Sequence, residues 1–304
     1  MLWRTPLLGA GYTNRAGVMA ASLLPGAGAS APVEMSPAAD NFENNLLGVA
    51  VGSDGSGFVA IYPEAAASGG AISFMYRTSA DGVTWSAPAA VETNVTASIR
   101  APQVVGNASG YLLLTPTSSS SASRRILSGG TLGPALGGAY GSIAASATEF
   151  AFIEQEGSAP KAYVYKAGAW DTGFACTRGN SESRMMIAGN ASGFRVASGN
   201  STHVYDGSSW SAAQALGQRH INNLVGVGNE YAVALTDDPW TTTPLVFAAR
   251  TSGGTLPTTT TLGAGAYEFQ DRDIAVAATP AGNWALWALP DAVTGVEVVV
   301  VKGF

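Results

Sequence analysis

Residues 104–111 read VVGNASGY and residues 187–194 read IAGNASGF, so two distant segments carry nearly the same pattern. In each segment a Gly/Asn/Ser turn separates two apolar runs, which is the signature of a β-hairpin. Looser copies of this hairpin occur at residues 49–62, 143–155, 224–235 and 274–289. This recurrence predicts an architecture built from similar units.

A second hairpin follows each of the first five copies, so that each unit contains four short antiparallel strands. These second hairpins lie at residues 72–91, 124–136, 162–175, 202–216 and 245–262. The unit length is close to the roughly 40–50 residues of a propeller blade. We therefore expect an all-β fold, a six-bladed β-propeller with four antiparallel strands per blade. The alternative is a double-sheet sandwich, which does not require six similar double hairpins.

The sixth unit is one strand short, because only residues 295–304 follow its first hairpin. An unpaired edge of valines in this strand would promote aggregation. The sequence SAPVE at residues 30–34 resembles SAPAAVE at residues 86–92, in the fourth strand expected for the first unit. We expect residues 28–36 to supply the missing strand and close blade six, so that the propeller spans residues 28–304.

Residues 1–27 fall outside this ring, and their Gly/Ala/Pro content gives them no core of their own. We expect them to form an N-terminal arm that anchors the chain to other subunits of a larger assembly. Residues 16–31 also resemble a secretory signal that ends in an Ala-x-Ala-like site. We expect this segment to be retained.

The composition excludes several classes of function. The net charge is −6 and the chain contains three lysines, so it lacks the basic surface that nucleic-acid binding requires. Cys176 is the only cysteine and His203 and His220 are the only histidines, so we expect neither an internal disulfide nor a metal or other cofactor. No apolar run approaches the roughly 20 residues that span a bilayer.

A polar turn in the first unit carries the pattern Ser79-x-Asp81-Gly82-x-Thr84-Trp85. This turn resembles the Asp-box of sialidase-like β-propellers (BNR repeats), whose pattern has one more residue between Asp and Trp. A shorter echo runs from Asp206 to Trp210. We interpret these residues as structural, since the Asp side chain accepts N–H bonds within the turn and the Trp ring packs between sheets.

The resemblance to sialidases also implies a catalytic site, formed by three arginines, a Tyr–Glu pair and an acid/base Asp. The family's Arg-Ile-Pro signature is replaced here by Ile99-Arg100-Ala101-Pro102. We therefore assign no catalytic residue, and a sialidase-like glycoside hydrolase is the alternative interpretation.

Charged residues recur at or just before the first strand of several units, where a propeller opens its central channel. The loops between the second and third strands should open at the same channel mouth, and two of them carry an aromatic residue. The candidate ligand-binding residues are Arg100, Arg184, Arg219, Arg272, Asp271, Asp273, Trp240 and Tyr62. They indicate either a salt-bridge network or a site for an anionic or hydroxyl-rich ligand.

The expected function is that of a non-enzymatic binding and assembly module. Its loops at the channel mouth would contact a host-surface glycan or neighbouring subunits, and the low charge resembles that of a phage virion component, such as a tail-tip or fibre-associated protein. We expect an extracellular or virion-associated location, with secretion as the alternative. A purely structural scaffold is a further alternative.

Overall fold

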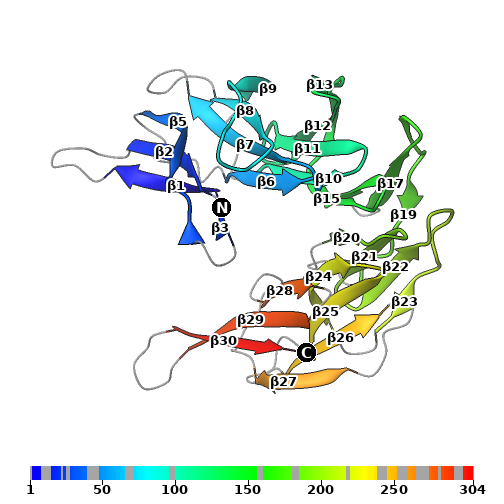
Figure 1. Ribbon diagram of the computed structural model, residues 1–304. Helices are drawn as coiled ribbons and strands as arrows, with labels where there is room; N and C mark the ends of the chain where they lie inside the picture. Colours follow the sequence, from blue (N-terminus) through cyan, green and yellow to red (C-terminus); the bar gives the residue numbers. More distant parts are fainter. Residues whose placement is uncertain are drawn as a thin grey trace. The chain divides into compact units, whose positions relative to one another are not determined.

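In the computed structural model every regular element of the described residues is a β-strand (Figure 1). No helix among these residues has the length and apolar character needed to cross a membrane. The described residues are 2–7, 15–21, 23–24, 28–39, 48–65, 72–95, 100–155, 160–179, 185–216, 220–237, 245–251, 259–264, 274–279, 282–290 and 297–303.

The chain divides into two units, Met1–Ile143 and Ala144–Phe304. The first unit contains two antiparallel sheets of four or five strands. In chain order their strands are β6 (Ala50–Ser53), β7 (Phe58–Ala65), β8 (Ile72–Ser79) and β9 (Ala89–Val95), then β10 (Gln103–Asn107), β11 (Gly110–Pro116), β12 (Ser121–Ser128), β13 (Thr131–Leu132) and β14 (Leu136–Ala139). The strands β13 and β14 both pair with β12.

The N-terminal residues of the first unit form a three-stranded sheet of β1 (Leu2–Leu7), β2 (Arg15–Ala20) and β5 (Val33–Ala39). Between β2 and β5, the short strands β3 (Leu23–Leu24) and β4 (Gly28–Ala29) pair with each other. The buried residues Ala20 and Met35 from this region pack against Ala60 and Tyr62 of β7.

The second unit continues the pattern of antiparallel sheets, although β15 begins just before its boundary. The strands of the first two sheets are β15 (Gly141–Ala145), β16 (Phe150–Glu154), β17 (Lys161–Lys166), β18 (Ala169–Trp170) and β19 (Phe174–Ala175), then β20 (Met186–Gly189), β21 (Phe194–Ser198), β22 (Ser201–Tyr205) and β23 (Gln214–Ala215). Those of the last two are β24 (His220–Val227), β25 (Glu230–Thr236), β26 (Leu245–Thr251) and β27 (Thr260–Ala264), then β28 (Ile274–Thr279), β29 (Gly282–Pro290) and β30 (Glu297–Gly303).

The all-β class and the antiparallel sheets of four strands are confirmed, since five sheets have four or five strands each. Six blades closed by an N-terminal strand are not confirmed. The strand β5, which covers the predicted closing segment 28–36 in part, pairs with β2 instead. The sheet of β28, β29 and β30 contains three strands within the described residues. The strand β2 lies near β5 in sequence, and burial of Met35 with Tyr62 stabilises the pairing that the structure shows.

The five larger sheets share one register. In each sheet an aromatic residue lies near the start of the second strand and pairs with one residue near the end of the third strand. The pairs are Phe58–Ser79, Tyr111–Leu127, Phe150–Tyr165, Phe194–Tyr205 and Tyr231–Thr251. Residues that hold the same place in this register are called equivalent below.

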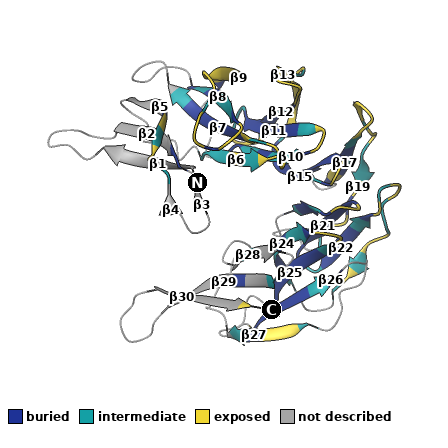
Figure 2. Cartoon of the chain, viewed as in Figure 1, coloured by how far each residue is buried: buried dark blue, intermediate teal, exposed yellow. Residues whose placement is uncertain are grey.

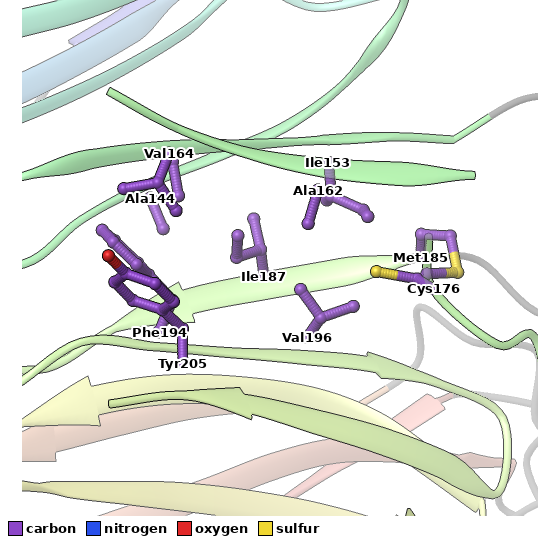
Figure 3. Close-up of a cluster of buried hydrophobic side chains, with 11 residues drawn as sticks. Ala144, Ile153, Ala162, Val164, Cys176, Met185, Ile187, Phe194, Val196 and Tyr205 are labelled. Carbon is purple, nitrogen blue, oxygen red and sulfur yellow. The ribbon is translucent and has the colours of Figure 1, made fainter. Parts of the chain in front are cut away.

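Apolar side chains between neighbouring sheets form the core. In the first unit, Val59 and Ile61 of β7 pack with Val104 of β10 and Leu113 of β11. Figure 3 shows the corresponding cluster of the second unit, in which Ile153 of β16 packs with residues of β20 to β22. The second strands β11 and β25 are buried almost throughout (Figure 2).

Three equivalent glycines let neighbouring first strands approach closely. A Cβ atom at Gly106 would lie 2.6 Å from the carbonyl oxygen of Ser53, and one at Gly189 would lie 1.9 Å from that of Ala145. One at Gly226 would lie 1.7 Å from the carbonyl oxygen of Gly189. These distances are far shorter than van der Waals contact. The close packing of neighbouring sheets therefore requires glycine at the position before each turn, where no side chain fits.

Candidate functional site

The turn between the first and second strands is tied by an Asp or Asn side chain. Asp54 Oδ1 accepts the N–H groups of Ser56 and Gly57, each at 2.8 Å. The equivalent Asn190 Oδ1 accepts those of Ser192 at 2.8 Å and Gly193 at 2.9 Å. The repeated NASG and DGSG sequences therefore encode one turn geometry, which needs an amide or carboxylate oxygen but not a charge.

The turn at Asp81 lies between β8 and β9. Asp81 Oδ1 accepts the N–H groups of Thr84 at 2.7 Å and Val83 at 2.8 Å, while Gly82 has a φ of 71°. Ser79 Oγ accepts the N–H of Gly82 at 2.8 Å. The hydrogen bonds to Asp81, led by those from the Thr84 and Val83 N–H groups, lower its pKa to about 2. The side chain is therefore ionised and committed to the turn.

The turn at Asp206 in the second unit has the same construction. Asp206 Oδ1 accepts the hydroxyl of Ser208 at 2.7 Å and the N–H groups of Ser208 and Ser209, both at 2.9 Å. The bond from the Ser208 hydroxyl, followed by those from the two N–H groups, lowers the pKa of Asp206 to about 2.

We expect thermal stability to fall as the pH drops from about 4 to about 2. The folded-state pKa values of Asp81 and Asp206 lie below the ordinary value of 3.8, so their stabilisation is fully present above that value and is lost as the folded carboxylates protonate. Thermal midpoints measured across this range for the native chain and an Asp81→Ala/Asp206→Ala variant provide the check. A variant whose midpoint shows the same acid dependence as the native chain would contradict this assignment.

The tryptophan that follows each turn packs on aromatic or apolar neighbours. Trp210 stacks on Phe174 at 5.5 Å between ring centroids and lies 5.2 Å from Tyr205. Trp85 packs against the cluster that contains Tyr62. The Nε1 atoms of Trp85 and Trp210 are both buried without a hydrogen-bond partner among the described residues. Because the buried Nε1 atom without a partner occurs in both copies of the turn, we attribute it to the repeated structure and not to a ligand-binding site.

The residue after the tryptophan also belongs to the repeated turn, although its role was not predicted from the sequence. Ser86 Oγ accepts the N–H of Thr78 at 3.0 Å, and Ser211 Oγ accepts that of Val204 at 3.0 Å. The sequence signal was the shared Trp-Ser pair, whose serine reaches back to the third strand.

A cavity of 540 Å³ lies where the turn ends of sheet β6–β9 and sheet β10–β14 meet. We call it the turn-end cavity. Its lining residues are Asp54, Ser56, Gly57, Phe58, Thr78, Ser79, Ala80, Thr84, Trp85, Ser86, Gly110, Tyr111, Leu127, Gly129 and Gly130. Ala80, Thr84 and Ser86 are exposed, so the cavity opens to solvent.

Asp54 and Tyr111 form the polar wall of the turn-end cavity, and each side chain shifts the pKa of the other. Burial raises the pKa of Asp54, but hydrogen bonds from Ser56, Gly57 and Tyr111 outweigh it and hold the pKa below the ordinary value. Burial and the bond to Asp54 raise the pKa of Tyr111 to about 12. The wall therefore carries an ionised carboxylate beside a protonated phenol.

Two small residues of the cavity lining, Gly57 and Ala80, have long side chains as their equivalents in another sheet. In sheet β15–β19, Glu149 and Lys166 are equivalent to Gly57 and Ala80. Lys166 Nζ lies 2.9 Å from Glu149 Oε1 and donates to the carbonyl oxygen of Gly207 at 2.8 Å. Loss of these two long side chains in sheet β6–β9 leaves the space open.

Most of the ligand-binding residues predicted from the sequence lie outside the described residues. These are Arg184, Arg219, Arg272, Asp271, Asp273 and Trp240. Arg100 is described: its Nε donates to the carbonyl oxygen of Ser119 at 3.2 Å, and its guanidinium carbon lies 5.1 Å from the ring centroid of Tyr140. Tyr62 is fully buried, and its hydroxyl accepts the Nε–H of Arg77 at 3.0 Å. Its ring is packed in the core and does not face a ligand at the surface.

His203 and Cys176 of the second unit are engaged in packing. His203 Nε2 accepts the N–H of Thr177 at 2.9 Å, and its Nδ1 lies 3.1 Å from the carbonyl oxygen of Ser211. Since Nε2 accepts a hydrogen bond, Nδ1 is the nitrogen that donates to the Ser211 carbonyl oxygen. Burial raises the pKa of the Cys176 thiol to about 12, so the thiol is protonated and unreactive at neutral pH.

No protein-family model and no curated protein sequence matches this chain. Among solved structures, the β-propeller domain of the Trilobed protease from Pyrococcus furiosus matches 100% of this chain and 93% of that chain, with a TM-score of 0.54 and 7% identity. The acylaminoacyl peptidase of Pyrococcus horikoshii matches 99% of this chain with a TM-score of 0.54 and 7% identity, and this chain spans 48% of that one.

Aleuria aurantia lectin in complex with α-methyl-L-fucoside matches 84% of this chain and 94% of that chain, with a TM-score of 0.42 and 12% identity. At such low identities the comparisons bear on the fold alone. The antiparallel sheets, their shared register and the matches with TM-scores of 0.54 agree: the chain has a β-propeller fold.

Proposed function

We propose that the chain is a non-enzymatic β-propeller binding module that holds a sugar unit in the turn-end cavity. The observation that carries this proposal is the lining of the cavity, which combines the rings of Trp85 and Tyr111 with hydroxyl groups and the Asp54 carboxylate. A pyranose ring stacks its C–H face on aromatic rings, while its hydroxyls need polar partners. The volume of 540 Å³ falls within the roughly 300–1,000 Å³ of small-molecule sites.

The electrostatics of the cavity favour binding over hydrolysis. A glycosidase needs a carboxyl group whose pKa is raised so that it can donate a proton. The pKa of Asp54, the carboxylate that lines the cavity, is instead lowered by turn hydrogen bonds. This carboxylate therefore acts as a hydrogen-bond acceptor at neutral pH.

The proposal predicts that an Ala80→Leu variant loses sugar binding. Ala80 is exposed and lines the cavity, so a leucine there would fill part of the space and change stability by no more than about 0.5 kcal/mol. A glycan array identifies the best ligand, and isothermal titration calorimetry then compares the native chain with the variant. We expect affinity to fall at least tenfold.

The matched control is Ala191→Leu, at an exposed turn position of sheet β20–β23. This change should leave the affinity unaltered. Equal affinity of the native chain and the Ala80→Leu variant for the array ligand would show that sugars bind elsewhere, and an array without any ligand would remove the proposal altogether.

The alternative function is a sialidase-like glycoside hydrolase, for which the Asp-box pattern of residues 79–85 is the motivating feature. Its active site would lie at the channel mouth, among the charged residues predicted from the sequence. Turnover of a fluorogenic sialoside by the native chain, abolished by Arg272→Ala, would favour this alternative.

The biological setting is a proposal from the sequence. We propose an extracellular or virion-associated protein, such as a phage tail-tip or fibre component, that contacts a host-surface glycan and joins other subunits through residues 1–27. The low content of charged residues, 12%, motivates this setting. Electron microscopy of purified particles labelled with an antibody to the chain would test it, and labelled particles would support it.

A further inference from the structure

The second unit shows what occupies the space equivalent to the turn-end cavity. Between sheets β15–β19 and β20–β23, the ammonium group of Lys166 lies 2.9 Å from Glu149 Oε1 and donates to the carbonyl oxygen of Gly207 at 2.8 Å. At this place the protein itself positions a cation between a carboxylate and a glycine carbonyl.

In the first unit both members of this ion pair are replaced, Lys166 by Ala80 and Glu149 by Gly57. Gly129, the equivalent of Gly207, still lines the cavity. Both glycines have positive φ values, 54° for Gly129 and 92° for Gly207, although the next residue has a positive φ in the first unit (Gly130, 76°) and not in the second (Ser208). The glycine at this place in the turn is therefore shared, while none of the described residues that line the cavity carries an ammonium group.

Asp54 supplies the negative charge in place of Glu149. Its equivalents Asn107 and Asn190 accept the same kind of turn hydrogen bond as neutral amides. The turn therefore does not require the charge of Asp54. Asp54 is also the one charged side chain among the described residues that line the cavity, so an unneutralised carboxylate faces this space.

We propose that the ligand of the turn-end cavity is an amino sugar with a free, protonated amino group, which pairs with Asp54 in the place that the Lys166 ammonium takes in the second unit. This inference rests on the proposed function of the cavity. A charge-assisted hydrogen bond to a carboxylate is about twice as strong as a neutral one. The rings of Trp85 and Tyr111 contact the sugar ring, which distinguishes an amino sugar from a linear amine.

The test compares three trisaccharides by isothermal titration calorimetry: the β-1,4-linked trimers of glucosamine, N-acetylglucosamine and glucose. Spermidine serves as a cation without a sugar ring. We expect the native chain to bind the glucosamine trimer at least tenfold more tightly than the other three compounds. Because the pairing lies at an opening to solvent, this preference should shrink as the salt concentration rises.

Two variants isolate the charge. Asp54→Asn keeps the turn oxygen, as Asn107 and Asn190 show, so its thermal midpoint should match that of the native chain while the preference for the glucosamine trimer is lost. Ala80→Lys restores the lysine of the second unit and should abolish binding of this trimer. Retained preference in Asp54→Asn, or retained binding in Ala80→Lys, would overturn the proposal.

The outcomes also separate this inference from the function on which it rests. If the neutral trimers bind as tightly as the glucosamine trimer, and Ala80→Leu abolishes that binding, the cavity is a sugar site but the amino group is not recognised. If spermidine binds as tightly as the glucosamine trimer, the sugar ring is not recognised and the amino-sugar proposal fails. If none of the four compounds binds, the amino-sugar proposal fails as well.

Discussion

Replacement of Gly226 by alanine is expected to unfold the second unit or to lower its thermal midpoint strongly. The added Cβ would lie 1.7 Å from the carbonyl oxygen of Gly189 and 2.5 Å from its carbonyl carbon. Overpacking a core costs about 1–3 kcal/mol where side chains can move. Here the obstacle is the backbone of the neighbouring sheet, so we expect a loss at or above the upper end of that range.

Thermal and urea unfolding followed by tryptophan fluorescence measure this loss. The control is Gly137→Ala, because a Cβ at Gly137 meets no atom within 4 Å and its φ is not positive. Gly137→Ala should be close to neutral. If Gly226→Ala were as stable as the native chain, the first strands of these sheets would not be packed as closely as described.

The Phe194→Ala variant is expected to lose about 3–5 kcal/mol of unfolding free energy, the usual cost of deleting a buried aromatic ring. Phe194 is fully buried in the cluster of Figure 3 and lies 6.0 Å from Tyr205 between ring centroids. The equivalent Phe58 is 36% exposed, so Phe58→Ala should cost only about 1–2 kcal/mol.

Urea unfolding of both variants checks this difference between equivalent positions. Because the chain divides into two units, the transition of each unit has to be followed separately, for example by hydrogen exchange read by mass spectrometry. Equal losses in the two variants would mean that the two aromatic residues have similar environments, contrary to the structure.

Much of the fold could be predicted from the sequence, because the repeated hairpins are local. The turn between paired strands needs particular residues, and those of VVGNASGY and IAGNASGF recur at Asn107 and Asn190 with the same hydrogen bonds. Such contacts depend on residues two or three positions apart. They are therefore visible in a short window of sequence.

The number of blades and their closure could not be predicted in the same way. The similarity of residues 30–34 to residues 86–92 did identify a strand, β5, but a strand pattern does not specify its partner. Pairing with β2 is decided by tertiary packing, in which Met35 and Ala20 are buried with Tyr62. From the sequence, Tyr62 is expected at the channel mouth. Its burial depends on packing against the N-terminal sheet, which a local sequence pattern does not reveal.

The turn-end cavity was missed because it is defined by absent side chains. The sequence prediction looked for charged and aromatic residues at the channel mouth, whereas the cavity arises where Gly57 and Ala80 replace Glu149 and Lys166. A register-based alignment of the copies would have shown this substitution. It would also have shown that Asp54 adds a charge where Asn107 and Asn190 are neutral.

A crystal structure of the chain with the tightest-binding array sugar tests the central claim most directly. Our account predicts electron density for a sugar ring in the turn-end cavity, stacked on Trp85 or Tyr111 and within hydrogen-bond distance of Asp54. Density for the sugar at another place, with the cavity empty, would contradict the account.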